Sequence, residues 1–210
     1  MPINQNSRIH HSAGSVFVLS TKSTGIIAAI SVGIAAAARP YGAQMSGPSL
    51  LLSLGALRCC WLGGNMAISF LEAPVKFVSP TPSRRNLVDV GRHVFSAINK
   101  VEVFLAALDI VGWSLVLQRG LVPSASSPSG SLGLRQLGWK AWLGFAPGII
   151  VYMFQSFTFL PTLRSVGARF VEGKPVESAK VHGVYVGLEV LKVVTLVAST
   201  IGIGRALLKA

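Results

Sequence analysis

The sequence predicts an all-α integral membrane protein, a bundle of four transmembrane helices to which the N-terminal region could add one short helix. Only 12% of the 210 residues are charged and 51% are hydrophobic, whereas about a quarter of the residues in a soluble domain are charged. The mean hydropathy is +0.59, and four long apolar runs follow one another along the chain. The length suits one domain, and lipid is the solvent that fits this composition.

The net charge of +12 does not indicate a nucleic-acid-binding protein. Most Lys and Arg residues stand between the apolar runs, as Arg84, Arg85 and Arg164 do. Basic residues in such places orient membrane proteins and contact anionic headgroups. The chain lacks the interleaved aromatic and basic residues of a nucleic-acid module. We therefore expect the lipid bilayer, and no nucleic acid, as the partner of these cations.

Residues 1–45 are expected to form a separate N-terminal segment, either targeting-like or disordered. No Asp or Glu precedes Glu72, and the segment contains serines and few basic residues, as organelle transit peptides do. Its apolar run at 25–38 is shorter than the roughly 20 residues that a span requires. The run could be signal-like, or a short fifth helix ended by Arg39 and Pro40. This composition favours an organelle, mitochondrial or plastid, or an endomembrane location.

Residues 46–210 are expected to form a four-transmembrane-helix domain, with spans at about 50–71, 101–117, 141–160 and 181–203. Ser46, followed by Gly and Pro, is a helix entry, and Pro74 closes the first span. The second linker is rich in Ser, Gly and Pro, which is typical of a flexible connection. Basic residues slightly favour the first and third linkers, which predicts that both chain ends lie on the opposite side of the membrane.

Charged and polar residues inside the predicted spans are the most informative feature of the sequence. A charged side chain costs about 2.5 to 3.5 kcal/mol at the centre of a membrane helix, so these groups should face the bundle interior and pair. On each helix they recur at intervals of three and four residues, which places them on one face. The predicted polar interior comprises Arg58, Asn65, Asn99, Glu102, Asp109, His182, Glu189 and Lys192.

Two interpretations of this interior are open. Arg58 with Asp109 or Glu102, and Lys192 with Glu189, could neutralise each other and fix the packing of the helices. The same residues could instead form a path for protons, ions or a small solute, because ionisable groups within a membrane commonly mark such paths.

A cofactor is not expected, but two histidines keep a haem site open as an alternative. His93 and His182 stand near the ends of two predicted helices, and histidines on facing helices can ligate haem iron. Interfacial or hydrogen-bonded histidines are the more ordinary case. Cys59 and Cys60 are expected to be buried free thiols rather than metal ligands, because neighbouring side chains on a helix point in different directions.

The motifs of common enzyme classes are absent from the sequence. It contains no phosphate-binding loop, no dinucleotide-binding fingerprint after a strand, no HExxH zinc motif and no GxSxG nucleophile motif. A hydrolase or a nucleotide-driven pump is therefore not expected, and we predict a protein that is not an enzyme.

Short motifs in the chain resemble those of the transmembrane protein 205 family. The first is the stretch from Trp61 to Phe77, WLGGNMAISFLEAPVKF; the second is Gly91 to Phe95, GRHVF; the third is the His182-Gly183 step. The resemblance covers about 50–210. The positions that carry it are Trp61, Gly63, Phe70, Pro74, Phe77, His93, Phe95 and His182.

The resemblance implies four spans and a general membrane role, with no assigned catalytic residues. The chain departs from the family in its intramembrane Arg58 and Lys192, and its second linker lacks the longer charged stretch of animal members. From the resemblance and the composition together, we expect a non-enzymatic, multi-pass membrane protein with a structural, trafficking or solute-handling role. The alternatives are proton, ion or small-solute transport, and a haem-binding subunit. The expected partners are the bilayer and either a homo-oligomer or a larger membrane complex.

Overall fold

The computed structural model describes residues 13–121, 146–176 and 178–208, and all regular secondary structure in these ranges is helical. Five helical segments are long and apolar enough to cross a membrane: Thr21–Gln44, Gly47–Val78, Arg84–Gln118, Ala146–Val171 and Lys180–Leu207. The predicted all-α class is confirmed, and the five helices fit an integral, multi-pass membrane protein. The number of such helices is five, whereas the sequence predicted four.

The additional long helix is α2 (Thr21–Gln44), which follows the short helix α1 (Ala13–Leu19). It has 24 residues and is therefore about 36 Å long, enough to cross a hydrocarbon core of about 30 Å. The sequence predicted an end at Arg39 and Pro40, but the helix continues through Pro40 for one more turn. The short fifth helix that the sequence left open is therefore a long one, while the assignment of residues 1–45 as a targeting-like or disordered segment stays a prediction.

Arg119 explains why α2 continues past its proline. This residue follows α5 (Arg84–Gln118), and its guanidinium donates hydrogen bonds to the last carbonyls of α2. The Nη1 atom lies 2.6 Å from the Met45 oxygen, and Nη2 contacts the oxygens of Gly42 and Ala43. The last carbonyls of a helix have no intrahelical donor, and a cation also suits the negative end of the helix dipole.

Two of the long helices contain a π-helical turn immediately before a proline. The first consists of α3 (Gly47–Asn65), the π segment η1 (Met66–Glu72) and α4 (Ala73–Val78). The second consists of α7 (Ala146–Phe154), η2 (Gln155–Phe159) and α8 (Leu160–Val171).

The prolines give these wide turns a physical cause. The N–H of Ala73 bonds the carbonyl of Ile68 and that of Leu160 bonds the carbonyl of Gln155, each five residues back. A proline cannot donate the usual bond, and its ring crowds the carbonyl four residues earlier, so a wider turn relieves the crowding. The third span therefore continues to Val171 instead of ending near 160, while positions 141–145 lie outside the described residues.

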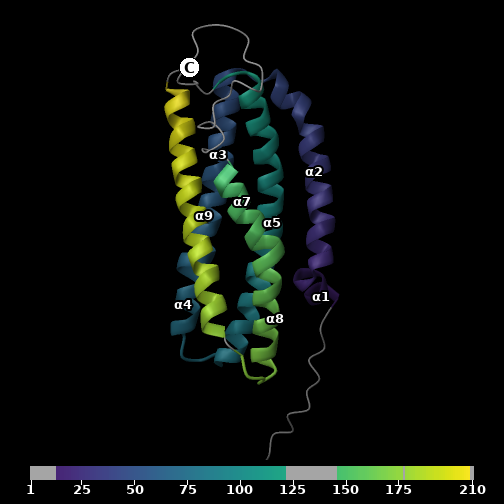
Figure 1. Ribbon diagram of the computed structural model, residues 1–210, viewed down its shortest axis with the longest axis vertical. Coiled ribbons are helices and arrows are strands. Elements are labelled where there is room, and N and C mark those ends of the chain that lie inside the picture. Colours follow the sequence, from purple (N-terminus) through teal and green to yellow (C-terminus); the bar gives the residue numbers. More distant parts are fainter. Residues whose placement is uncertain (1–12, 122–145, 177, 209–210) are drawn as a thin grey trace, which may run out of the picture.

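Helix α5 lies at the centre of the bundle. It packs against α2 on one side and against α3 and α8 on the others, while α9 (Ser178–Leu207) packs against α3, α7 and α8 (Figure 1). A buried apolar cluster of Leu51, Trp113 and Val116 fills one end of the bundle. A second cluster, around Trp61 and Tyr152, lies at mid-height with rings 5.4 Å apart, edge to face.

The two ends of the molecule differ in charge. The connections from α4 to α5 and from α8 to α9 lie at the same end of the bundle (Figure 1), which we call the basic end. The Lys and Arg residues in or beside these elements are Lys76, Arg84, Arg85, Arg92, Arg164, Arg169, Lys174 and Lys180.

The predicted placement of both chain ends opposite the basic linkers is only half right. The start of α3 and the end of α9 do lie at the other end of the bundle, but α1 lies at the basic end (Figure 1). The reason is the extra long helix α2, because an odd number of long helices puts the two ends of the described chain at opposite ends of the bundle.

Candidate functional site

The buried polar residues line one face of α5 and the helix faces opposite it. Ser96, Asn99, Glu102 and Asp109 on α5 are all less than 5% exposed. Their spacing of three, three and seven residues keeps them on one stripe of the helix. Each meets a polar partner from another helix, so the stripe forms a column of buried hydrogen bonds through the bundle.

At the end opposite the basic end, Arg58 and Asp109 form a closed ion pair. The Nε atom of Arg58 lies 2.7 Å from Oδ1 of Asp109, and Nη2 lies 3.1 Å from Oδ2. The guanidinium carbon also stands 5.0 Å from the centre of the Trp113 ring. Such a bidentate pair, stacked on an aromatic face, is the geometry that best stabilises a buried guanidinium. Of the two partners predicted for Arg58, the structure selects Asp109.

At mid-height, Lys192 is shared by two carboxylates, and we call Glu102, Glu189 and Lys192 the central trio. The Nζ atom of Lys192 lies 2.7 Å from Oε1 of Glu102 and 3.1 Å from Oε1 of Glu189. The same two oxygens accept hydrogen bonds from Trp61 at 2.8 Å and from Gln155 at 2.7 Å. With both carboxylates ionised, the trio carries one excess negative charge.

Polar contacts continue from the central trio toward the basic end. Ser156 on η2 lies 2.6 Å from the side-chain oxygen of Asn99, and the Tyr152 hydroxyl donates to the Asn99 carbonyl at 3.2 Å. One turn further along α5, Arg164 of α8 donates from Nε to the Ser96 hydroxyl at 2.7 Å. The widened turn of η2 therefore directs two polar side chains at the column, as π turns at functional sites commonly do.

The last carbonyls of α1 are held by two buried cations from this region. Lys100 donates to the Val18 oxygen at 2.5 Å, and Nη1 of Arg164 donates to the Leu19 oxygen at 3.2 Å. The negative end of a helix dipole is a suitable partner for such cations. The N-terminal helices thus complete the polar interior that the other helices form.

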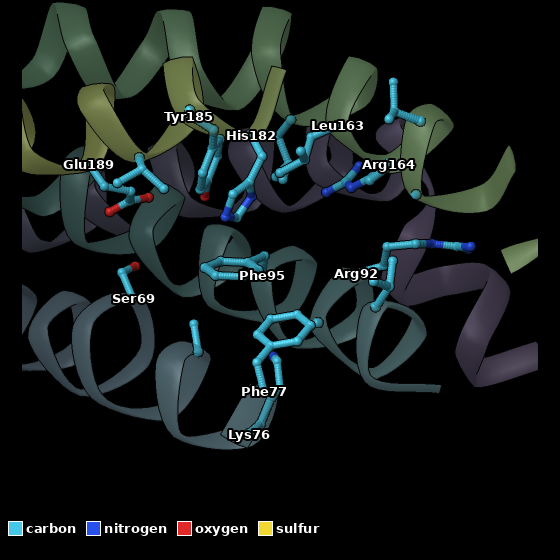
Figure 2. A pocket seen from close by; sticks show the side chains of 18 of the residues that line it. Ser69, Lys76, Phe77, Arg92, Phe95, Leu163, Arg164, His182, Tyr185 and Glu189 are labelled. Carbon is cyan, nitrogen blue, oxygen red and sulfur yellow. The ribbon is translucent and has the colours of Figure 1, made fainter. Parts of the chain in front are cut away.

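A pocket of about 650 Å³ opens at the basic end between η1, α4, α5, α8 and α9. Its walls are mainly apolar and aromatic, and the residues that line it include Ser69, Phe70, Pro74, Lys76, Phe77, Arg84, Arg92, Phe95, Arg164, His182, Tyr185 and Glu189. Figure 2 shows Arg92 and Arg164 at one end of the pocket and Ser69 and Glu189 at the other. The pocket therefore runs from a cationic end to the central trio.

Three polar atoms near this pocket have no hydrogen-bond partner within the part of the chain that the structure describes. They are Oε2 of Glu189, Nη2 of Arg164 and Nε of Arg92. Glu189 is 3% exposed and Arg164 is 8% exposed. Because an unpaired polar atom that is buried costs about 1 to 3 kcal/mol, such atoms in one pocket indicate a place where a ligand or a proton can bind.

The structure brings together most residues of the predicted polar interior. Arg58, Asn65, Asn99, Glu102, Asp109, Glu189 and Lys192 are all buried. His182 is different, because it is exposed and lines the pocket instead of facing the interior. The additional residues that sequence reasoning did not place in the polar interior are Arg92, Ser96, Lys100 and Arg164.

Sequence reasoning placed Arg164 in a linker because the third span was expected to end near 160. Helix α8 continues through that proline and buries Arg164. Spacing could not have found it, because nine residues after Gln155 are about two and a half α-helical turns and predict the opposite helix face.

Of the eight positions that carry the family resemblance, five line the pocket: Phe70, Pro74, Phe77, Phe95 and His182. Trp61 is buried beside the central trio, and a side chain added at Gly63 would meet open space. His93 does not line the pocket; its Nδ1 lies 2.9 Å from the Asp89 carbonyl. Cys59 and Cys60 are free and exposed rather than buried, because their face of α3 points away from the bundle.

No group of three or more His, Cys, Asp or Glu residues that could hold a metal ion occurs in the described ranges. Comparisons with known proteins find no matching family model, no matching curated protein and no matching solved structure. The resemblance to the transmembrane protein 205 family therefore stays a prediction. Over the described residues, fold and site are those of an all-helical chain with five helices long and apolar enough to cross a membrane, a polar interior and a pocket at its basic end.

Proposed function

We propose that this chain is a non-enzymatic, solute-handling membrane protein in which the pocket at the basic end admits a solute and the central trio exchanges a proton. The observation that carries the proposal is the position of Glu189. One of its carboxylate oxygens belongs to the central trio, and the other, Oε2, accepts no hydrogen bond from the described residues. The same side chain lines the pocket, so the pocket and the central trio share this carboxylate.

The charges around Glu189 suit proton exchange. Lys192 and Glu102 complete the central trio, while Tyr185 and Arg164 line the pocket beside it. Two carboxylates share a single ammonium group in a low-dielectric interior, where an uncompensated charge is expensive. One bound proton makes the trio neutral, so the trio can take up and release a proton without separating the helices.

The Arg58–Asp109 pair is better explained as structural. Two hydrogen bonds join its partners, and both side chains are at most 3% exposed. The pair is electrically neutral by itself, so it supplies no excess charge for a proton or an ion. The polar interior thus combines a closed pair, which fixes the packing of the helices, with a central trio that can exchange a proton.

A flux measurement tests the proposal. The full chain is reconstituted into vesicles that contain a pH-sensitive dye, and a potassium diffusion potential drives proton entry. We expect proton entry above that of protein-free vesicles, and we expect Glu189→Gln to lower it to that background. Glu172→Gln is the matched control, because this carboxylate is exposed and does not line the pocket.

A second measurement separates loss of flux from loss of folding. Each variant is examined by circular dichroism and gel filtration in mild detergent before reconstitution. A folded Glu189→Gln protein that conducts protons like the original chain would contradict the proposal. Absence of any flux from the original chain would also contradict it and would favour a purely structural role.

A further inference from the structure

We infer that the pocket binds a single-chain amphiphile with an anionic head, whose head lies at the Arg92 and Arg164 end and whose chain lies between the phenylalanines. The inference rests on the proposed function only in using the same pocket, because binding does not require that protons move. It assigns a chemical class to the solute: a fatty-acid-like anion that can enter from the membrane.

The cationic end of the pocket carries the first part of the argument. Four cations line the pocket, namely Lys76, Arg84, Arg92 and Arg164, whereas Glu189 is the one carboxylate among its described lining residues. Lys76 and Arg92 contact the carboxylates of Glu72 at 3.2 Å and Asp89 at 3.4 Å. These two acids do not line the pocket, so the charge that faces a ligand there is positive.

Arg164 supplies the specific donor. Its Nε and Nη1 atoms are engaged by Ser96 and by the Leu19 carbonyl, which fixes the plane of the guanidinium. Its Nη2 atom has no partner in the described chain although the residue is 8% exposed. An anionic oxygen would satisfy this donor, and a charge-assisted hydrogen bond is roughly twice as strong as a neutral one.

Two glycines leave space for the side chains of Arg92 and Lys76. A Cβ atom at Gly167 would stand 2.8 Å from Cδ of Arg92, and one at Gly91 would stand 3.2 Å from Nζ of Lys76. A Cβ atom at Gly167 would force Arg92 to shift, whereas one at Gly91 would displace the Lys76 ammonium by only a few tenths of an ångström. The helix surfaces are therefore shaped around the cationic end of the pocket.

The rest of the pocket suits a hydrocarbon chain. Its walls include Phe70, Phe77, Phe95, Phe170, Leu163 and Val186. A volume of about 650 Å³ lies within the usual range of small-molecule sites. Figure 2 shows Phe95 and Phe77 between the cationic end and Glu189. A small inorganic anion would leave these walls uncovered, and a neutral lipid would offer Nη2 of Arg164 only an uncharged acceptor.

The charge at the far end sets the orientation of the ligand. Glu189 repels an anionic head, so the head lies at the Arg164 end and the chain points toward Ser69 and Glu189. A protonated Glu189 would accommodate the end of the chain more readily than a charged one, which links ligand binding to the proton exchange proposed above.

Photo-crosslinking tests the inference on the full chain in vesicles of zwitterionic lipid. The probe is palmitate that carries a diazirine in its chain, and mass spectrometry locates the adducts. We expect adducts on α4, α5, α8 and α9, and we expect unlabelled palmitate to compete. Palmitamide, which has the same chain without the charge, should compete about tenfold more weakly or worse, because its carbonyl oxygen is an uncharged acceptor for the guanidinium. Acetate, the head alone, should not compete.

Two variants on α9 form a matched pair. Gly183 lines the pocket and Gly187 does not, and an added Cβ meets nothing within 4 Å at either position. Gly183→Leu should fill the pocket and abolish specific labelling, whereas Gly187→Leu should label like the original chain. Arg164→Gln should remove the preference for palmitate over palmitamide. If that variant does not fold, the inference is still tested by comparing Gly183→Leu with Gly187→Leu and by the competition of palmitate and palmitamide for the original chain.

Two results would overturn the inference: equal competition by palmitate and palmitamide, or unchanged labelling of a folded Gly183→Leu protein. The result is separable from the proposed function. A chain that binds palmitate but conducts no protons would remove the proposed function and keep the inference. Proton flux that depends on Glu189, in a chain that does not bind palmitate, would remove the inference and keep the proposed function.

Discussion

Arg58 and Asp109 at one end of the bundle meet through two hydrogen bonds, and the Trp113 ring covers them. Toward the basic end, Glu189 and Arg164 are also buried, yet each has one polar atom without a partner in the described chain. The first region is packed against an apolar cluster that includes Leu51 and Val116. The second borders a pocket of about 650 Å³.

This difference distinguishes charge that holds helices together from charge that is available to a ligand. A buried pair whose charges neutralise each other gives specific packing, and the loss of either partner is strongly destabilising. A buried group with an unused donor or acceptor beside a pocket contributes less to packing and can bind something else. Both regions use residues that sequence reasoning would class together as intramembrane charges.

The largest expected effect comes from making the same change, carboxylate to amide, in the two regions. Asp109→Asn leaves the Arg58 guanidinium buried without a counter-charge, and breaking such a pair costs about 3 to 5 kcal/mol. Glu189→Gln keeps the Lys192 contact with Glu102 and makes the central trio neutral, so we expect a change within about 1 kcal/mol. The free energy of unfolding, measured in mild detergent for both variants, gives the comparison.

Equal losses of stability in these two variants would break the distinction between the regions. A rescue experiment sharpens it further. The double variant Arg58→Met, Asp109→Leu replaces the pair with apolar side chains, and it should recover much of the stability lost in Asp109→Asn, because no buried charge is left alone. If the double variant does not regain this stability, the Arg58–Asp109 pair contributes more to the fold than the neutralisation of two buried charges.

Sequence reasoning placed the charged residues of α5 and α9 correctly because spacing along one helix fixes which residues share a face. It left two partners open for Arg58, since the choice between Glu102 and Asp109 depends on how far one helix is shifted along another. It paired Lys192 with Glu189 but missed the second carboxylate, Glu102, for the same reason. Relative shifts between helices are set by packing, which a single sequence does not display.

The pocket was harder to foresee than the polar interior. It depends on the π turns before Pro74 and Pro161 and on the continuation of α8 to Arg164. In water-soluble helices a proline usually ends the helix, and that rule misplaced the end of α2 at Pro40. Within a membrane, the cost of leaving backbone groups unbonded favours continuing the helix with an adjusted turn.

The second prediction concerns Trp61, which stands between the two regions. Trp61→Phe keeps an aromatic ring but removes the N–H that donates to Glu102 at 2.8 Å. A hydrogen bond to a charged group contributes about 1.5 to 3 kcal/mol, so we expect a loss of stability of that size. A double-mutant cycle with Glu102→Gln measures the coupling directly. A coupling energy near zero would show that Trp61 acts only through its ring.

The third prediction extends the comparison to α2. A side chain at Gly42 would meet Leu115 of α5, because its Cβ would lie 2.8 Å from Cδ1 of that leucine, whereas Gly33 faces open space. Gly42→Leu should therefore destabilise the chain by about 1 to 3 kcal/mol through overpacking. Gly33→Leu should change stability by less than about 0.5 kcal/mol. Thermal unfolding in detergent measures both, and equal effects would mean that α2 does not pack on α5 in solution.

The smallest expected effect lies outside the membrane, at the connection that follows α8. The Lys174 ammonium lies 2.6 Å from the Glu172 carboxylate and holds the pKa of that carboxyl below its usual value of 4.5. A carboxyl whose pKa is lower in the folded state stabilises the fold above pH 4.5, and the contribution disappears as the pH falls through the folded pKa. Because both side chains are about half exposed, water and salt screen the pair. Glu172→Gln should therefore lower the melting temperature slightly at pH 7 in low salt, and not at all at a pH below the folded pKa or in high salt. A melting-temperature difference that persists in acid would assign the effect to the shape of the turn at Gly173 rather than to charge.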